Sequence, residues 1–125
     1  MPAYRFARVL NQTRGSVVAA RCRVAVGPLR RIFGLHLLPE LTPGEGLLLP
    51  GTNSMDTMFM GYPIDVAFLD GGGRVKRVVP AMRPWRIVPW ARAARDCLEL
   101  PAGALAQTGT QPGDHLVFED LSGTE

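Results

Sequence analysis

Residues 62–79, YPIDVAFLDGGGRVKRVV, decide the fold, because two runs of strand-forming residues flank a turn rich in glycine. Glycines tolerate the positive φ angles of a tight turn, so we expect a β-hairpin here. Side chains alternate between the two faces of a strand, so Asp65 shares its face with the apolar Ala67 and Leu69. A carboxylate on such a face needs a polar partner, which makes Asp65 the first candidate for a special role.

The composition is that of one ordinary globular domain. With 125 residues, 46% hydrophobic and 20% charged, we expect a single domain over residues 1–125, with a core at about 4–119 and a polar tail at 120–125. The 11 prolines and 14 glycines leave little room for long helices. Short strands joined by loops are therefore favoured.

The formal charge of +3 comes mainly from arginines scattered along the chain. Because no concentrated basic stripe or known module is apparent, we do not expect a nucleic-acid partner. No apolar run approaches the roughly 18 residues of a membrane span. Arg5 and Arg8 stand where a secretory leader needs its hydrophobic region, so we expect a cytoplasmic protein, or an exported one if a leader has been removed.

Cysteine and histidine give little support for a metal site. Cys22 and Cys97 are isolated from each other and from any histidine at zinc spacing, so we expect no metal and no cofactor. Two buried free thiols are favoured over a single disulfide. His36 and His115 are more typical of packed or surface imidazoles than of catalytic ones.

The remaining pattern indicates a mainly β fold. Further strands are expected at residues 4–10, 16–26, 47–49, 96–100 and 115–119, and short helical pieces at 29–38 and 104–107. Strands and helices do not alternate as in βαβ units. We therefore expect an antiparallel sandwich, a jelly-roll-like arrangement or a barrel of short strands with one or two short helices.

Glu99 repeats the oddity of Asp65, because it lies with Cys97 on the face opposite Leu98 and Leu100. If their strands are neighbours, the two carboxyls would serve as acid and base in a hydrolysis. The alternative is that each accepts hydrogen bonds from arginines or backbone amides and holds the fold together.

An aromatic and methionine-rich region supplies the other candidates. Asp56 precedes the run Met58-Phe59-Met60, which is more typical of a core or cavity wall than of a cofactor site. Trp85 and Trp90 lie in the proline-rich residues 80–90. Their rings either pack over the end of a β core or form an aromatic floor for a ligand.

An ordered set of motifs runs through most of the chain: Gly34-Leu35, Glu45-Gly46-Leu47-Leu48-Leu49, Pro63-Ile64-Asp65-Val66-Ala67-Phe68-Leu69-Asp70, Leu98-Glu99-Leu100-Pro101-Ala102-Gly103 and Pro112-Gly113-Asp114. From about Cys22 to about Phe118 the chain resembles the domain of unknown function 192 family. The resemblance implies a small, mainly β domain and almost nothing about activity. It assigns the family's recurrent polar positions to Asp65, Glu99 and Asp114, and its backbone requirements to Gly34, Gly103 and Gly113.

The chain departs from this family in two respects. Many members carry an aromatic-Met-Lys-Asn-Thr segment before the Pro-Ile-Asp strand, where this chain has Met55-Asp56-Thr57-Met58-Phe59-Met60-Gly61-Tyr62. Many also begin with a secretory leader, which the start of this chain does not resemble.

Three hypotheses follow from the sequence. The first is a non-enzymatic binding or accessory module for an unidentified small ligand or protein, with a surface formed by Asp56, Asp65, Trp85, Trp90 and Glu99. The second is a small hydrolase that uses Asp65 and Glu99 as its acid pair. In the third, these carboxylates have purely structural roles.

Overall fold

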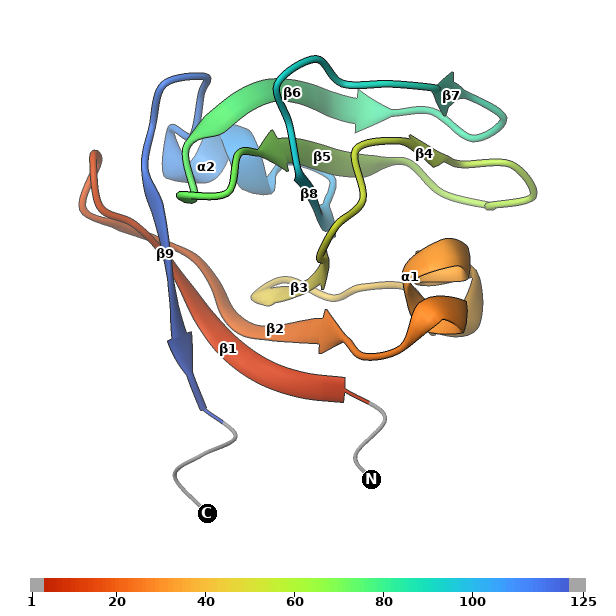
Figure 1. Cartoon of the computed structure of the whole chain (residues 1–125), viewed down its shortest axis with the longest axis horizontal. Helices are drawn as coiled ribbons and strands as arrows, with labels where there is room; N and C mark the ends of the chain where they lie inside the picture. The colour runs from red at the N-terminus through yellow and green to blue at the C-terminus, as the bar shows by residue number, and fades with distance from the viewer. Residues whose placement is uncertain (1–3, 122–125) are drawn as a thin grey trace.

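The computed structural model describes residues 4–121, which form one curled sheet and a small second layer (Figure 1). The strands are β1 (Tyr4–Asn11), β2 (Ser16–Ala25), β3 (Glu45–Leu49), β4 (Met55–Asp56), β5 (Ile64–Leu69), β6 (Val75–Met82), β7 (Ile87–Val88), β8 (Asp96–Pro101) and β9 (Leu116–Asp120). The helices are α1 (Pro28–Phe33), the single-turn 3-10 helix η1 (Gly34–Leu37) and α2 (Ala104–Thr108).

The main sheet has the strand order β6-β5-β8-β3-β2-β1-β9 and curls into a half-barrel. Its pairs are antiparallel except for β2 and β3, whose parallel pairing is made possible by the crossover through α1 and η1. The two edge strands approach at one end through an isolated bridge between Arg74 and His115. β4 and β7 form a separate two-stranded sheet.

Two apolar clusters lie on the two faces of the curled sheet. The inner cluster includes Val9, Leu98 and Leu116 and is closed by Leu105 of α2. The outer cluster lies under η1 and the β4/β7 layer and includes Phe68. All six residues of β5 are buried, as expected for a strand covered on both faces. A polar side chain on β5 or β8 must therefore find its partners inside the protein.

The glycine turn joins β5 to β6 as the sequence predicts. The Asp70 carboxylate accepts the backbone N–H groups of Gly72 and Arg74 at 3.0 and 2.9 Å. Gly73 has φ +86°, and a Cβ at this position would clash with the carbonyl oxygen of Leu116. The Leu116 N–H in turn donates to the Gly73 carbonyl at 2.8 Å, so the absence of a side chain allows β9 to approach the turn.

Asp65 ties three elements together from the inner face of the sheet. One oxygen accepts the Ala81 N–H at 2.7 Å, where β6 shifts its register. The other accepts the N–H groups of Gly103 and Leu105, at 3.1 and 2.8 Å, at the start of α2. A carboxylate that satisfies the first N–H groups of a helix acts as its cap. The partners are backbone amides, which is the environment that the third hypothesis describes for Asp65.

The mainly β prediction is confirmed, and the arrangement is closest to the barrel alternative. The opening hairpin, the hairpin at residues 62–79 and the helical turn before Gly109 all form. Cys22 and Cys97 are buried and free, as favoured from the sequence. Residues 122–125 of the expected polar tail lie outside the described residues.

The helix expected at residues 29–38 forms as α1 and η1, but no residue of α1 is buried. Its apolar residues Leu29, Ile32 and Phe33 are exposed, so the helical spacing does not mark a core face. Among residues 4–121, no helix combines the length and apolar character needed to cross a membrane.

Replacing Asp65 by alanine should lower the free energy of unfolding by at least about 3 kcal/mol, because three buried N–H groups lose their acceptor. Urea denaturation measures this loss. Glu119→Ala is the control, since it removes an exposed ion pair with Arg8 and should change stability by less than about 1 kcal/mol. Equal, small effects of both substitutions would contradict the structural role of Asp65.

Gly73→Ala and Gly44→Ala form a matched pair, because both glycines have nearly the same φ, +86° and +89°, and only Gly73 has a close neighbour. We expect Gly44→Ala to cost about 1–2 kcal/mol from the left-handed backbone alone. Gly73→Ala should cost at least about 3 kcal/mol, because the Leu116 carbonyl must move as well. Equal losses in denaturant melts would show that β9 does not need this approach.

A candidate ligand cleft beside Glu99

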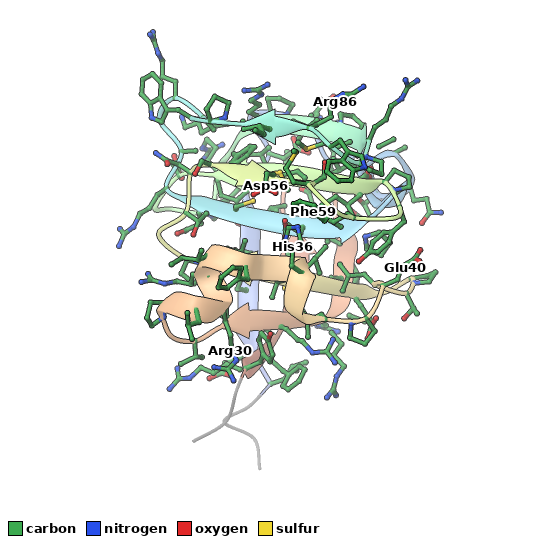
Figure 2. All side chains as sticks on the ribbon, turned by 90° about the vertical axis from the view of Figure 1, so that its right-hand side faces the viewer. Arg30, His36, Glu40, Asp56, Phe59 and Arg86 are labelled. Carbon is green, nitrogen blue, oxygen red and sulfur yellow. The ribbon has the colours of Figure 1, made fainter. Side chains whose placement is uncertain are left out.

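A cleft of about 920 Å³ opens on the outer face of the sheet, between α1 and η1 on one side and the β4/β7 layer on the other. Figure 2 looks onto this side and shows His36, Asp56 and Phe59 close together. Glu99 of β8 also lines the cleft. The cleft thus collects polar groups from three separate elements of the chain.

Glu99 contributes a buried carboxyl with an unfilled hydrogen-bonding position. The side chain is only 3% exposed, and its Oε1 atom has no hydrogen-bond partner among the described residues. The backbone N–H of Leu35 donates to the carboxyl group. A Cβ on Gly34 would lie 3.2 Å from Oε1, so glycine leaves space beside this oxygen. The φ of +54° at Gly34 favours glycine independently.

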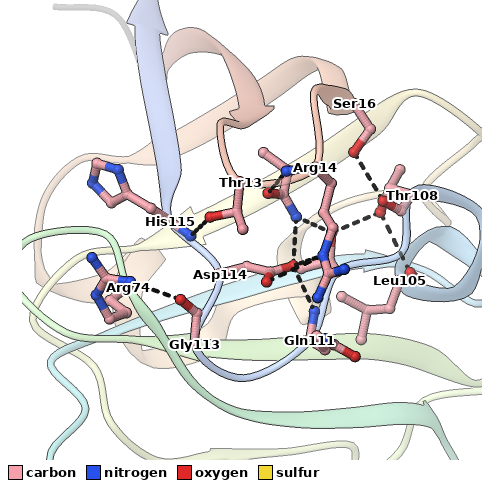
Figure 3. A network of polar contacts seen from close by, with 12 residues as sticks. Thr13, Arg14, Ser16, Arg74, Leu105, Thr108, Gln111, Gly113, Asp114 and His115 are labelled. Atoms are coloured by element: carbon pink, nitrogen blue, oxygen red, sulfur yellow. Dashed lines mark hydrogen bonds and ion pairs between the residues drawn. The ribbon is translucent and has the colours of Figure 1, made fainter.

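The other two buried acids of the described residues are fully satisfied. Asp65 accepts its three backbone N–H groups. Asp114 accepts hydrogen bonds from Asn11, Arg14 and the Gln111 N–H at 2.9, 3.1 and 3.1 Å, in the network of Figure 3. Buried polar groups in folded proteins are normally paired. Glu99 is the exception, and it is the one that faces a cleft.

Burial raises the pKa of Glu99 from 4.5 to about 8. The nearby Asp56 charge adds to this rise, whereas His36 and the Leu35 N–H oppose it. The carboxyl is therefore mostly protonated at neutral pH. A buried group with a shifted pKa in a cleft is a marker of functional sites.

The surroundings of His36 favour the protonated form of its ring. Its Nδ1 atom lies 2.7 Å from the Phe33 carbonyl oxygen and its Nε2 atom 2.5 Å from that of Met58, and both contacts require an N–H on the ring. Burial lowers the pKa of His36, but the two carbonyls and the charges of Asp56 and Glu99 outweigh it and raise the pKa above 6.5. The Nε2 atom lies 3.8 Å from Asp56 Oδ1.

The mouth of the cleft is apolar and exposed. Ile32 and Phe33 of α1, together with Phe59 and Ile87, line the cleft and are exposed, and Phe59 is 80% exposed. The Phe59 ring packs against Trp85, with ring centroids 4.7 Å apart and planes tilted by 60°. Large exposed apolar side chains gathered around a cleft are typical of binding sites.

The aromatic pair is fixed by Thr57, which is fully buried. Its carbonyl accepts the Trp85 N–H at 2.9 Å, and its hydroxyl donates to the Arg83 carbonyl at 2.6 Å and accepts the Arg86 N–H at 3.0 Å. Phe59 and Trp85 have φ of +65° and +64°, which is uncommon for bulky residues. Strained backbone of this kind is found where the rest of the structure imposes it, often at binding sites.

The structure brings together some of the site residues predicted from the sequence. Glu99 and Asp56 line the cleft, and Trp85 supports its rim through Phe59. Trp90 is 58% exposed and is not among the residues that line it. Gly34 borders Glu99, whereas Gly103, Gly113 and Asp114 lie in the turns around α2 and β9.

The register contradicts the Asp65/Glu99 acid pair of the second hypothesis. β5 and β8 are neighbours, but their register places Glu99 opposite Val66 and Asp65 opposite Leu100. Because directly opposed residues share a face, the two carboxyls point to opposite sides of the sheet. They cannot line one cleft, and the hydrolase that depended on this pair is not supported.

Sequence reasoning gave His36 and Phe59 too little weight. The signal for His36 was its position directly after Gly34-Leu35. One of its carbonyl partners, Phe33, is local, but the other, Met58, lies 22 residues further along the chain. The run Met58-Phe59-Met60 was interpreted from the sequence as part of a core or cavity wall. In the structure, Met58 and Phe59 line the cleft and Met60 is buried.

Fold and cleft together define a small curled β domain with a ligand-sized cleft on its covered face. A model of the DUF192 family, described as an uncharacterized ACR, matches residues 9–118. Since this match spans most of the chain, the protein belongs to the DUF192 family, as the sequence motifs predicted.

Similar proteins come from archaea and bacteria. A UPF0127 protein of Thermococcus sibiricus is 30% identical over 115 residues, which cover 89% of this chain and 74% of that protein. The crystal structure of a "putative transcription regulator" from Sinorhizobium meliloti has a TM-score of 0.79 at 25% identity, covering 94% of this chain and 97% of that one. A protein of unknown function from Novosphingobium aromaticivorans shares the fold, with a TM-score of 0.70 at 21% identity over 91% of this chain and 84% of that one.

The raised pKa of Glu99 predicts a specific pH dependence of stability. Between pH 4.5 and about 8, the folded protein keeps the Glu99 proton that the unfolded chain releases. The contribution of this group to the free energy of unfolding is therefore full below about pH 4.5 and is lost as the pH rises to about 8. Glu99→Gln should remove it, and the variant should gain stability relative to wild type across this range by several kcal/mol. Urea melts at several pH values measure the difference. A difference that does not change with pH would contradict the shift.

Proposed function

We propose that this protein is a non-enzymatic binding module and that the Glu99 cleft is its ligand site. The observation that carries the proposal is that Glu99 lines the cleft and that its buried Oε1 atom has no hydrogen-bond partner among the described residues. Leaving such an atom unpaired costs about 1–3 kcal/mol, and a ligand that hydrogen-bonds to it recovers this energy.

The size and lining of the cleft support the proposal. A volume of about 920 Å³ lies in the range of small-molecule sites. A few polar groups at the floor and apolar side chains at the mouth are the usual composition of such sites, because the polar groups orient the ligand and the apolar ones supply area. Glu99 and Asp56 are retained here from the surface proposed on sequence grounds, and Asp65 and Trp90 are not.

A second candidate, acid–base catalysis, is favoured by one observation. A Glu99 carboxyl that is protonated near neutral pH, beside the charge of Asp56, has the properties of a general acid. This pairing differs from the Asp65/Glu99 pair expected from the sequence. Conversion of a bound compound into a product would favour catalysis over simple binding.

The proposal is tested by a thermal-shift screen of sugars, peptides, amines and metal ions, followed by NMR titration of each compound that raises the melting temperature. We expect at least one compound to shift the amide signals of cleft residues such as Gly34 and Asn53. A screen without any compound that binds at the cleft would overturn the proposal.

Phe59→Ala should weaken such a ligand about tenfold, because it removes one exposed wall of the cleft. It should leave the fold intact, since the ring is 80% exposed. Trp90→Ala is the matched control, because it removes an exposed ring that does not line the cleft. Equal effects of the two substitutions on the dissociation constant would place the ligand elsewhere.

A further inference from the structure

The chemistry of the cleft floor indicates what kind of ligand it would take. Asp65 and Asp114 receive their hydrogen-bond donors from the chain itself, whereas Glu99 has one oxygen without a donor. The space beside this oxygen is kept open by Gly34. When Glu99 is ionised, the missing group is a hydrogen-bond donor that enters from the cleft.

A second acceptor lies on the same floor. Asp56 Oδ1 accepts the Met58 N–H at 2.9 Å, and the structure shows no hydrogen bond to Oδ2 among the described residues. The side chain of Asp56 is 44% exposed within the cleft. A group that carries several donors and a positive charge is suited to a floor with two carboxyls.

The cations already present do not fill this role. The His36 ring is committed to two carbonyl oxygens and lies beside Asp56. Arg31 lies at the side of the cleft and donates to the Pro50 carbonyl at 3.4 Å. Neither forms a hydrogen bond or an ion pair with Glu99 in the described structure.

The mouth of the cleft adds a requirement for an apolar body. The rings of Phe33 and Phe59 and the side chains of Ile32 and Ile87 surround the entrance. Aromatic rings attract cations through their faces, and apolar side chains gain free energy when a ligand covers them. A charged head group on an apolar body satisfies both parts of the site.

We propose that the Glu99 cleft binds an organic cation, a protonated amine on an apolar or aromatic body, with its ammonium group at Glu99 Oε1. This inference rests on the proposed function and specifies its ligand class. Binding converts Glu99 from the neutral to the ionised form, and the proton is released to solvent. The affinity for an amine should therefore rise with pH.

The other ionisable groups around Glu99 do not hide the rise of amine affinity with pH. The pKa values of Cys97 and Tyr62 are both raised by burial, from 9.0 and 10.0, so these groups stay neutral below about pH 8.5. Arg31 is a further charged group at the side of the cleft. His36 loses its proton above its raised pKa, which would also favour a cation, so a Glu99 variant is needed to separate the two effects. Asp56 contributes its negative charge.

The test uses three compounds with the same aromatic body and different head groups: phenethylamine, phenethyl alcohol and phenylpropionate. Dissociation constants are measured by NMR titration of the Leu35 amide signal between about pH 6 and about pH 8.5, where the amine stays protonated. We expect the amine to bind most tightly, with an affinity that rises up to about tenfold per pH unit below pH 8. An acetylated Phe-Lys-Phe amide, measured in parallel, distinguishes a lysine of a partner protein from a free amine. Whichever of phenethylamine and the peptide binds more tightly supports the inference and shows whether the ammonium group belongs to a free amine or to a lysine of a partner protein.

Glu99→Gln should weaken the amine at least tenfold near pH 8 and remove the Glu99 part of the pH dependence. Glu119→Gln is the matched control, because it removes the same charge on β9, outside the cleft, and should leave the affinity unchanged. Binding of the alcohol or the carboxylate that equals or exceeds that of the amine would overturn the ligand class and leave the binding module standing. Failure of all four compounds to bind would overturn the inference, while the broader screen judges the proposed function separately.

Discussion

The structure depends on one constraint: β5 and β8 are buried on both faces, so each carboxyl on them must find hydrogen-bond donors without water. Asp65 meets this constraint with backbone amides of β6 and of the loop and helix that follow β8. In doing so it holds α2 against the inner face of the curled sheet and fixes the shift in register of β6. Its role is to join these elements, and for this reason its environment leaves no room for a ligand.

Glu99 meets the same constraint only in part, from the outer face. Here the covering layer consists of short pieces, α1, η1 and the β4/β7 pair, which leave a cleft where a continuous layer would have supplied donors. The protein tolerates an unpaired oxygen, an exposed aromatic pair at positive φ and an apolar helix face, all around this one cleft. Local departures from good packing that gather in one place are typical of functional sites.

The sequence was informative where a local pattern determines the structure. The glycine turn and the alternation of side chains along the flanking strands predicted the hairpin. Asp65 and Glu99 were recognised as unusual because the side chains around them are apolar. The sequence could not supply the register between β5 and β8, which a shift of one residue reverses, so the Asp65/Glu99 pair was assigned to one cleft in error. It also could not show that Leu29, Ile32 and Phe33 face solvent, or that His36 meets the Met58 carbonyl of a distant segment, because both depend on tertiary packing.

A ¹³C NMR titration of the side-chain carboxyl carbons tests the central claim most directly, because it compares a satisfied buried acid with an unsatisfied one in the same sample. Asp114 is the satisfied acid. The hydrogen bond from Arg14 lowers its pKa, burial opposes this effect, and the hydrogen bonds from Asn11 and Gln111 add to it, so Asp114 should titrate below its ordinary pKa of 3.8. Glu99 should titrate near pH 8, and an amine bound in the cleft should lower its pKa. A Glu99 carboxyl that titrates near its ordinary pKa of 4.5 in the free protein would show that it already has a partner, and would contradict the account.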